Sequence, residues 1–182
     1  MDIKKFDIEG PLLIAPRVFN DERGYFFESF HIEKYTNAGI PLNFVQDNES
    51  KSSKGVLRGL HFQNPPFDQG KLVRVVKGKV LDVAVDIRKN SPTYGKHISV
   101  ELSDENKLQL WIPPGFAHGF LSLVDETIFI YKCTNVYNKE SEDGILWNDE
   151  DLKINWGIEN PIVSDKDLIL QSFKALNSKF DQ

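Results

Sequence analysis

Two histidines and a lysine stand at positions from which their side chains could meet in one polar pocket. His61 and Gln63 fall on the same face of a predicted strand over 57–63, Lys71 opens the next predicted strand, and His118 follows a proline-glycine turn. An imidazole with a pKa of about 6.5 readily accepts a proton at neutral pH, and a buried lysine can stabilise negative charge on a substrate oxygen. This combination indicates proton-transfer chemistry. A core histidine and a surface lysine remain the alternatives.

The spacing around these residues resembles the metal-binding motif of cupin β-barrels, G-x5-H-x-H-x3,4-E-x6-G followed by P-x-G-x2-H. The first and last histidines of the motif are present, whereas Gln63 replaces the second histidine and Lys71 replaces the glutamate. Two histidines could still hold a metal, but the third nitrogen ligand and the carboxylate are absent from their expected places. The resemblance therefore predicts a cupin frame without a metal site, in which His118 lies across the barrel from His61.

Further polar candidates lie on two of the predicted strands. Gln46 and Asn48 are two residues apart, so their amides face the same side, which is either a solvent face or a wet barrel interior. Arg58 falls on the opposite face of its strand from His61, unless Gly59 allows a bulge that turns it. We predict this bulge, because an Arg58 side chain that points into the barrel is more useful than one that points outward.

A tyrosine and an aspartate complete the set of candidates for acid–base chemistry. Tyr131 shares a strand face with apolar side chains, so core packing explains it unless its hydroxyl reaches a reacting carbon and delivers a proton. Asp167 follows Ser164 by three residues and could complete a capping arrangement at a helix start. A carboxylate could also orient a catalytic imidazole. The sequence alone does not bring Asp167 to His61.

Short β segments separated by Gly, Pro, Asn and Asp must position these residues, and they predict an all-β sandwich or barrel. Strands are expected at 71–76, 80–87, 98–102, 108–112, 116–124 and 127–136. A short helix is predicted over 31–38, because Gly39 and Pro41 end it. A second helix, capped by Ser164, is predicted from about 165 into the region of 174, with Leu168 and Phe173 packing against the protein.

Length and charge limit the possible classes of protein. The 182 residues predict one domain, 1–182, and the formal net charge of −5 with scattered basic residues argues against nucleic-acid or membrane partners. Cys133 is the only cysteine, which excludes an internal disulfide and a cysteine zinc cluster. The first residues lack the apolar core of a signal peptide, and no apolar run approaches the roughly 18 residues of a membrane span. A cytoplasmic protein is the prediction.

A series of separated motifs extends from about residue 17 to residue 167. They are Phe26-Phe27-Glu28, Phe44 to Asn48, Gly55 to His61, Lys71 to Val75, Asp82 to Asp86, Ser91 to Gly95, Pro114 to Phe120, Tyr131-Lys132, Tyr137, Glu142, Trp147 to Asp149 and Ser164 to Asp167. In this order they resemble the dTDP-4-dehydrorhamnose 3,5-epimerases. The resemblance implies a cupin-type jelly roll, all-β with a few short helices, including a C-terminal one.

The resemblance also implies a reaction. A cofactor-free epimerase would invert C3 and C5 of dTDP-4-dehydro-6-deoxy-D-glucose to give dTDP-4-dehydro-L-rhamnose, in dTDP-L-rhamnose biosynthesis. Both carbons flank the C4 ketone, so loss of either proton gives an enolate, and protonation from the opposite face inverts the centre. By resemblance, His61 is the base and Asp167 is the residue that orients it. Tyr131 is the acid, and Lys71 stabilises the enolate.

Substrate-binding positions follow from the same resemblance. Arg58 and His118 match the sugar and diphosphate pocket. Four residues match nucleotide-binding positions, namely Arg23, Glu28, Gln46 and Asn48. Phe19 and Tyr137 match positions that stack on the ligand or form the pocket wall, and Glu142 matches a further carboxylate on the ligand side. Similar proteins form homodimers that exchange N-terminal segments, so Phe19, Arg23 and Glu28 serve either their own pocket or that of the partner.

Three other functions remain open. A related dTDP-4-keto-6-deoxy sugar epimerase would invert only C3 or C5, although the retained Tyr131 favours the double reaction. A metal-dependent cupin oxygenase or isomerase would need bound Fe, Mn or Zn. A non-catalytic nucleotide-sugar binding module would not need the acid–base residues.

Overall fold

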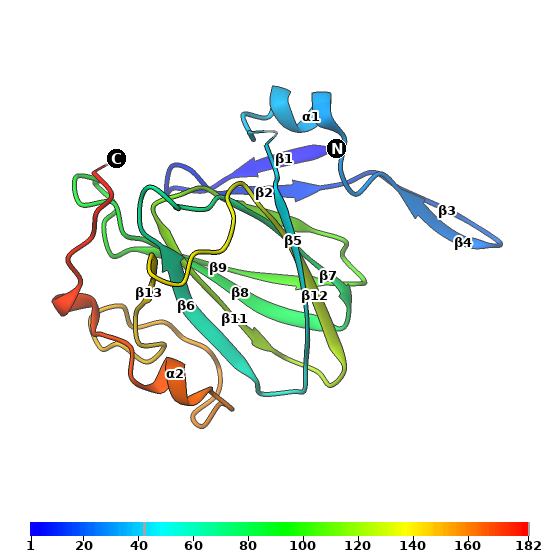
Figure 1. Ribbon diagram of the computed structural model, residues 1–182. Helices are drawn as coiled ribbons and strands as arrows, with labels where there is room; N and C mark the ends of the chain where they lie inside the picture. Colours follow the sequence, from blue (N-terminus) through cyan, green and yellow to red (C-terminus); the bar gives the residue numbers. More distant parts are fainter. Residues whose placement is uncertain (42, 182) are drawn as a thin grey trace.

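Two antiparallel sheets face each other in the computed structural model, which describes residues 1–41 and 43–181 (Figure 1). The six-stranded sheet contains, in spatial order, β1 (Asp2–Lys5), β2 (Leu12–Ala15), β10 (Gln109–Ile112), β7 (Lys71–Lys77), β12 (Thr127–Cys133) and β5 (Gln46–Ser52). The five-stranded sheet contains β13 (Glu142–Gly144), β6 (Leu57–Gln63), β11 (Phe116–Ser122), β8 (Lys79–Asp86) and β9 (His97–Ser103). The prediction of an all-β fold is confirmed.

Three short helical elements and one hairpin lie outside these sheets. The hairpin of β3 (Val18–Asp21) and β4 (Gly24–Phe27) extends away from the rest of the chain (Figure 1). The helical elements are α1 (Ile32–Asn37), α2 (Asp165–Leu168) and the 3-10 helix η1 (Phe173–Ala175). No helix in the described part of the chain is long and apolar enough to cross a membrane.

Apolar side chains fill the space between the sheets and also cover the outside of the smaller one. Val73 and Phe129 of the larger sheet pack with Ala84 of β8 in the inner cluster. Val83 and Val85, which alternate with Ala84, pack instead in an outer cluster beneath the C-terminal segment. Because both of its faces are covered, β8 is almost entirely buried.

The predicted strands are present with small shifts at their ends. β11 stops at Ser122 because the carbonyl of Val124 accepts bonds from the hydroxyls of Ser122 and Thr127, which close a turn. β12 stops at Cys133, three residues before the predicted end. The predicted helix over 31–38 corresponds to α1.

The long C-terminal helix is a wrong prediction. Ser164 caps α2 as expected, but α2 ends at Leu168. Gln171 then bridges to Ile145 like a strand residue, so long-range pairing wins over local helix propensity. Leu168 is 54% exposed and does not pack, whereas Phe173 in η1 packs against Tyr94.

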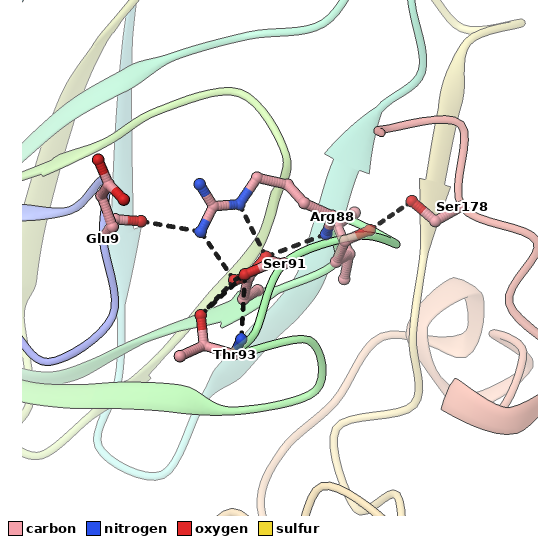
Figure 2. A network of polar contacts seen from close by, with 7 residues as sticks. Glu9, Arg88, Ser91, Thr93 and Ser178 are labelled. Atoms are coloured by element: carbon pink, nitrogen blue, oxygen red, sulfur yellow. Dashed lines mark hydrogen bonds and ion pairs between the residues drawn. The ribbon is translucent and has the colours of Figure 1, made fainter. Parts of the chain in front are cut away.

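A buried carboxylate fastens the end of β8. Arg88, Ser91 and Thr93 converge on Asp86 (Figure 2), with Nε and Nη2 of Arg88 donating over 2.9 and 2.7 Å and the two hydroxyls over 2.5 and 2.7 Å. Arg88 also donates to the carbonyl of Glu9, which attaches the N-terminal segment. Burial alone would raise the pKa of Asp86, but these donors outweigh it and lower the pKa.

We expect Asp86→Asn to lower the free energy of unfolding by about 3 kcal/mol at neutral pH, because Arg88 then loses its buried counter-charge. A carboxylate whose folded pKa lies below the ordinary 3.8 stabilises the fold above that pH, and this contribution disappears as the pH falls through the folded pKa. Urea denaturation near pH 7 and near pH 3 should therefore show a smaller difference between variant and wild type at low pH. A difference independent of pH would contradict the assignment.

Candidate active site

A cavity of about 560 Å³ opens between the two sheets. Its walls come from β5, β6, β7, β11 and β12 and from the segment around α2. Its polar and charged lining residues are Asn48, Glu49, Ser50, Arg58, His61, Lys71, His118, Tyr131, Ser164, Lys166 and Asp167. The structure therefore brings all four predicted catalytic residues into one cavity.

A histidine–carboxylate pair joins β6 to α2. Nε2 of His61 lies 2.6 Å from Oδ1 of Asp167, and the amide of Gly59 donates to Oδ2 over 3.3 Å. Burial alone would raise the pKa of Asp167. Hydrogen bonds and nearby charge outweigh burial and lower the pKa overall, and the bond with His61 contributes most to this lowering. An ionised carboxylate only accepts hydrogen bonds, so the Nε2 of His61 carries the proton and Nδ1 keeps its lone pair. The Asp167 side chain does not cap α2. The Ser164 hydroxyl caps this helix by accepting a hydrogen bond from the backbone amide of Asp167.

The strand that carries His61 is irregular, as predicted. His118 faces His61 across the ladder and Phe120 faces Arg58, so β6 has one residue more than β11 in this interval. Gly59 has φ +125°, and a Cβ there would lie 2.5 Å from the Cα of Gly119. Arg58 thereby reaches the cavity. The expectation that His118 lies across the barrel is wrong, because the two histidines are neighbours in one sheet.

Lys71 enters the cavity from the larger sheet. It shares its strand face with Val73 and Val75, which are buried in the inner cluster. Burial lowers the pKa of the Lys71 ammonium, and the nearby Cys133 and Asp82 oppose the shift. No carboxylate of the described residues lies within ion-pair distance of Lys71. The surface-lysine alternative is wrong.

Tyr131 stands on β12 of the larger sheet, whereas His61 stands on β6 of the smaller one. Its ring packs beside Phe129, 6.1 Å between centroids, and its side chain also lines the cavity. Burial raises the pKa of Tyr131, so the phenol keeps its proton at neutral pH. A protonated phenol and a histidine base thus approach the cavity from opposite sheets.

The predicted nucleotide residues of β5 extend from the cavity to its rim. Asn48 lines the cavity, so the solvent-face alternative is wrong for it, and it accepts a bond from Gln46 over 3.0 Å. Gln46 in turn accepts the amide of Tyr137 over 2.8 Å. The hydroxyl of Tyr137 donates to Glu142, which pairs with Lys166 at 2.6 Å. Gln46, Tyr137 and Glu142 therefore connect to the site without lining the cavity.

Gln63, which stands in the position of a cupin histidine, forms hydrogen bonds with the backbone of the neighbouring loops. Its amide nitrogen donates to the carbonyls of Phe67 and Val136, and its oxygen accepts the amide of Asn138. Within residues 1–41 and 43–181, no group of three or more His, Cys, Asp or Glu side chains is arranged to hold a metal ion.

Comparison with known proteins places this geometry in a family. The sequence profile described as dTDP-4-dehydrorhamnose 3,5-epimerase matches residues 5–175. The protein of that name from Shigella flexneri is 57% identical over 174 residues, which cover 95% of this chain and 96% of that protein. The chain belongs to the dTDP-4-dehydrorhamnose 3,5-epimerase family.

Solved structures of the epimerase family share the whole fold. The enzyme from Elizabethkingia anophelis is 50% identical, covers 97% of this chain and 98% of its own, and has a TM-score of 0.93. The Legionella pneumophila epimerase, solved in complex with dTDP-4-keto-L-rhamnose, is 47% identical over 97% of this chain and 94% of its own, with a TM-score of 0.92. The predicted cupin-type fold is confirmed.

A 3′-monoepimerase from Streptomyces bikiniensis, solved with dTDP-quinovose, is more distant. It is 33% identical, covers 93% of this chain and 86% of its own, and has a TM-score of 0.88. The double-epimerase relatives are thus closer in sequence, although both kinds share the fold.

Three residues that the resemblance to the epimerase family places at the nucleotide lie away from the cavity. Phe19 and Arg23 belong to the protruding hairpin, and Glu28 follows it. Arg23 pairs with Asp21 at 2.5 Å, and Glu28 pairs with Lys34. The structure of the single chain does not bring this group to His61.

Four polar or charged cavity residues were not among the predicted site residues, namely Glu49, Ser50, Ser164 and Lys166. Ser50 lines the cavity, and its buried hydroxyl has no hydrogen-bond partner in the described part of the chain. The alternation that singled out Gln46 and Asn48 also points to it. Lys166 was missed because it precedes Asp167 in a helix too short to show a polar face.

Proposed function

We propose that the protein is a dTDP-4-dehydrorhamnose 3,5-epimerase, which inverts C3 and C5 of dTDP-4-dehydro-6-deoxy-D-glucose. The observation that carries the proposal is the placement of a carboxylate-paired histidine and a protonated tyrosine on opposite sheets of one cavity. Inversion next to a ketone needs one group that removes a proton and another that returns it on the opposite face. Family membership supplies the substrate class.

In this reaction Nδ1 of His61 removes the proton at C3 or C5, and Asp167 holds the ring and stabilises the imidazolium. The electrons of the broken C–H bond move into the C4 carbonyl and form an enolate. Lys71, a cation without a paired carboxylate, stabilises the enolate oxygen. Tyr131 then protonates the carbon from the opposite face. Tyr131 regains a proton from solvent, and His61 releases to solvent the proton that it removed.

The substrate-binding roles follow the positions of the side chains. Arg58 and His118 line the cavity beside His61 and take the diphosphate and the sugar. Asn48 and Gln46 take the nucleotide, with Tyr137 and Glu142 at the rim. No cofactor enters this scheme.

A homodimer that exchanges hairpins would complete the site. Phe19, Tyr25 and Phe26 of the hairpin are 50%, 56% and 66% exposed, and a group of exposed aromatic side chains is typical of an interaction surface. In this arrangement Phe19, Arg23 and Glu28 reach the nucleotide in the partner's cavity. The prediction of a cytoplasmic protein stays a prediction.

Solvent exchange tests the function directly. The purified protein is incubated in D2O with dTDP-4-dehydro-6-deoxy-D-glucose, and deuterium at each carbon is followed by NMR. We expect deuterium at both C3 and C5 of the L-sugar product. Binding without exchange would leave a non-catalytic module, and activity that depends on added metal would favour the cupin oxygenase or isomerase.

The same experiment separates the single-centre alternative. The 3′-monoepimerase from Streptomyces bikiniensis is 33% identical in sequence to this chain, whereas the 3,5-epimerase from Shigella flexneri is 57% identical. Inversion confined to one carbon would replace the proposed reaction with the single-centre one.

A further inference from the structure

A second histidine–carboxylate pair lies in the cavity wall, beside the pair of His61 and Asp167. Asp82 sits in the middle of β8 and is fully buried, and each of its carboxylate oxygens lies 3.0 Å from Nε2 of His118. His118 is itself only 7% exposed, yet its side chain lines the cavity. The proposed reaction described above gives Asp82 no part.

The surroundings of Asp82 differ from those of the other buried carboxylate on its strand. Asp86 receives side-chain bonds from Arg88, Ser91 and Thr93, which together match its charge. The Lys71 ammonium lies near enough to interact with the charge of Asp82, but in the described part of the chain His118 alone donates a side-chain hydrogen bond to Asp82. A fully buried carboxylate with one such donor is costly for a fold to keep. The cost points to a task other than stability.

The contact determines the state of the His118 ring. A carboxylate only accepts hydrogen bonds, so Nε2 of His118 carries the proton in this pair. The ring also stacks on Phe129, with 6.2 Å between centroids and 24° between planes, which restricts its rotation. Nδ1 has no hydrogen-bond partner among residues 1–41 and 43–181. It is therefore the nitrogen that remains for a ligand.

We propose that Asp82 is a positioning residue of the epimerase site, which fixes the tautomer and orientation of His118 so that Nδ1 meets the sugar. The inference rests on the proposed function, since His118 contacts a sugar only if the cavity binds the substrate. Asp82 itself does not touch the substrate, because its carboxylate is fully buried and its strand, β8, pairs with β11 on the side away from β6 and does not line the cavity.

A double-mutant cycle tests the connection between the two residues. We expect Asp82→Asn to lower kcat by about 10- to 100-fold with a much smaller change in KM, because a turned ring misplaces a contact made during the reaction. In a His118→Gln background the same substitution should have almost no further effect, since its target is gone. An equal loss of kcat in both backgrounds would overturn the proposal.

Asp86→Asn is the matched control. It removes a fully buried carboxylate from the same strand, but outside the cavity lining. We expect it to lower the melting temperature while kcat stays near the wild-type value. If Asp86→Asn and Asp82→Asn lost kcat in parallel with stability, Asp82 would be structural only.

A measurement on the ring itself does not depend on activity. In ¹⁵N NMR spectra of the wild type, with His118 assigned by comparison with His118→Gln, we expect a protonated Nε2 and a bare Nδ1. Asp82→Asn should disturb this tautomer, whereas a protonated Nδ1 in the neutral wild-type ring would refute the proposal. If the wild type shows no solvent exchange, the proposed function fails, and the tautomer alone then decides the role of Asp82.

Discussion

We expect His61→Asn to lower the exchange of both the C3 and the C5 proton by about 10³-fold, which is typical of the loss of a general base. Of the two carboxylate-paired imidazoles at the cavity, His61 is the one assigned as the base, so in the proposed mechanism both carbons depend on this ring. Asparagine suits the test, because its amide can still donate to Asp167 and leaves no buried carboxylate unpaired. The measurement is deuterium uptake at each carbon by NMR.

His97→Asn is the control for this substitution. His97 lies on β9, is partly buried, and does not line the cavity, so the same chemical change there should leave exchange at the wild-type rate. Substantial exchange at either carbon in His61→Asn would mean that another group removes that proton. His118 would then be the next candidate, since it is the neighbour of His61 on β11.

Local alternation identified which residues of a single strand share a face and are therefore candidates for the interior. Lys71 shares a face with Val73 and Val75, so the period of two along β7 indicated a cation inside the barrel, although it left a surface lysine open as the alternative. The bulge at Gly59 was also predictable, because glycine tolerates φ values that other residues avoid. These features depend only on residues a few positions apart.

Contacts between distant segments were not predictable in this way. His61 and Asp167 are 106 residues apart, and their 2.6 Å contact depends on how the C-terminal segment folds back against β6. The same long-range packing shortened α2, since Gln171 pairs with Ile145 instead of continuing the helix. Asp82 was not predicted as a site residue, because alternation along the strand does not show that both faces of β8 are covered. Only a family resemblance linked His61 to Asp167 beforehand.

Tyr131→Phe should separate proton removal from inversion. We expect inversion at C3 and C5 to fall by about 10²-fold, while His61 continues to remove protons from the substrate. The enolate then recovers a proton from the His61 side, so deuterium enters the starting sugar with retention of configuration. NMR of the recovered substrate and product in D2O gives the ratio of exchange to inversion. This ratio should rise well above that of the wild type.

Tyr94→Phe controls for the loss of a phenol. Tyr94 is half-buried against Phe173 and does not line the cavity, so its variant should keep the wild-type ratio. Equal losses of exchange and inversion in Tyr131→Phe would contradict the assignment of Tyr131 as the acid, because a residue that acts only after enolate formation cannot slow proton removal to the same extent. The phenylalanine ring preserves the packing beside Phe129, so a parallel loss would not be explained by a disturbed core.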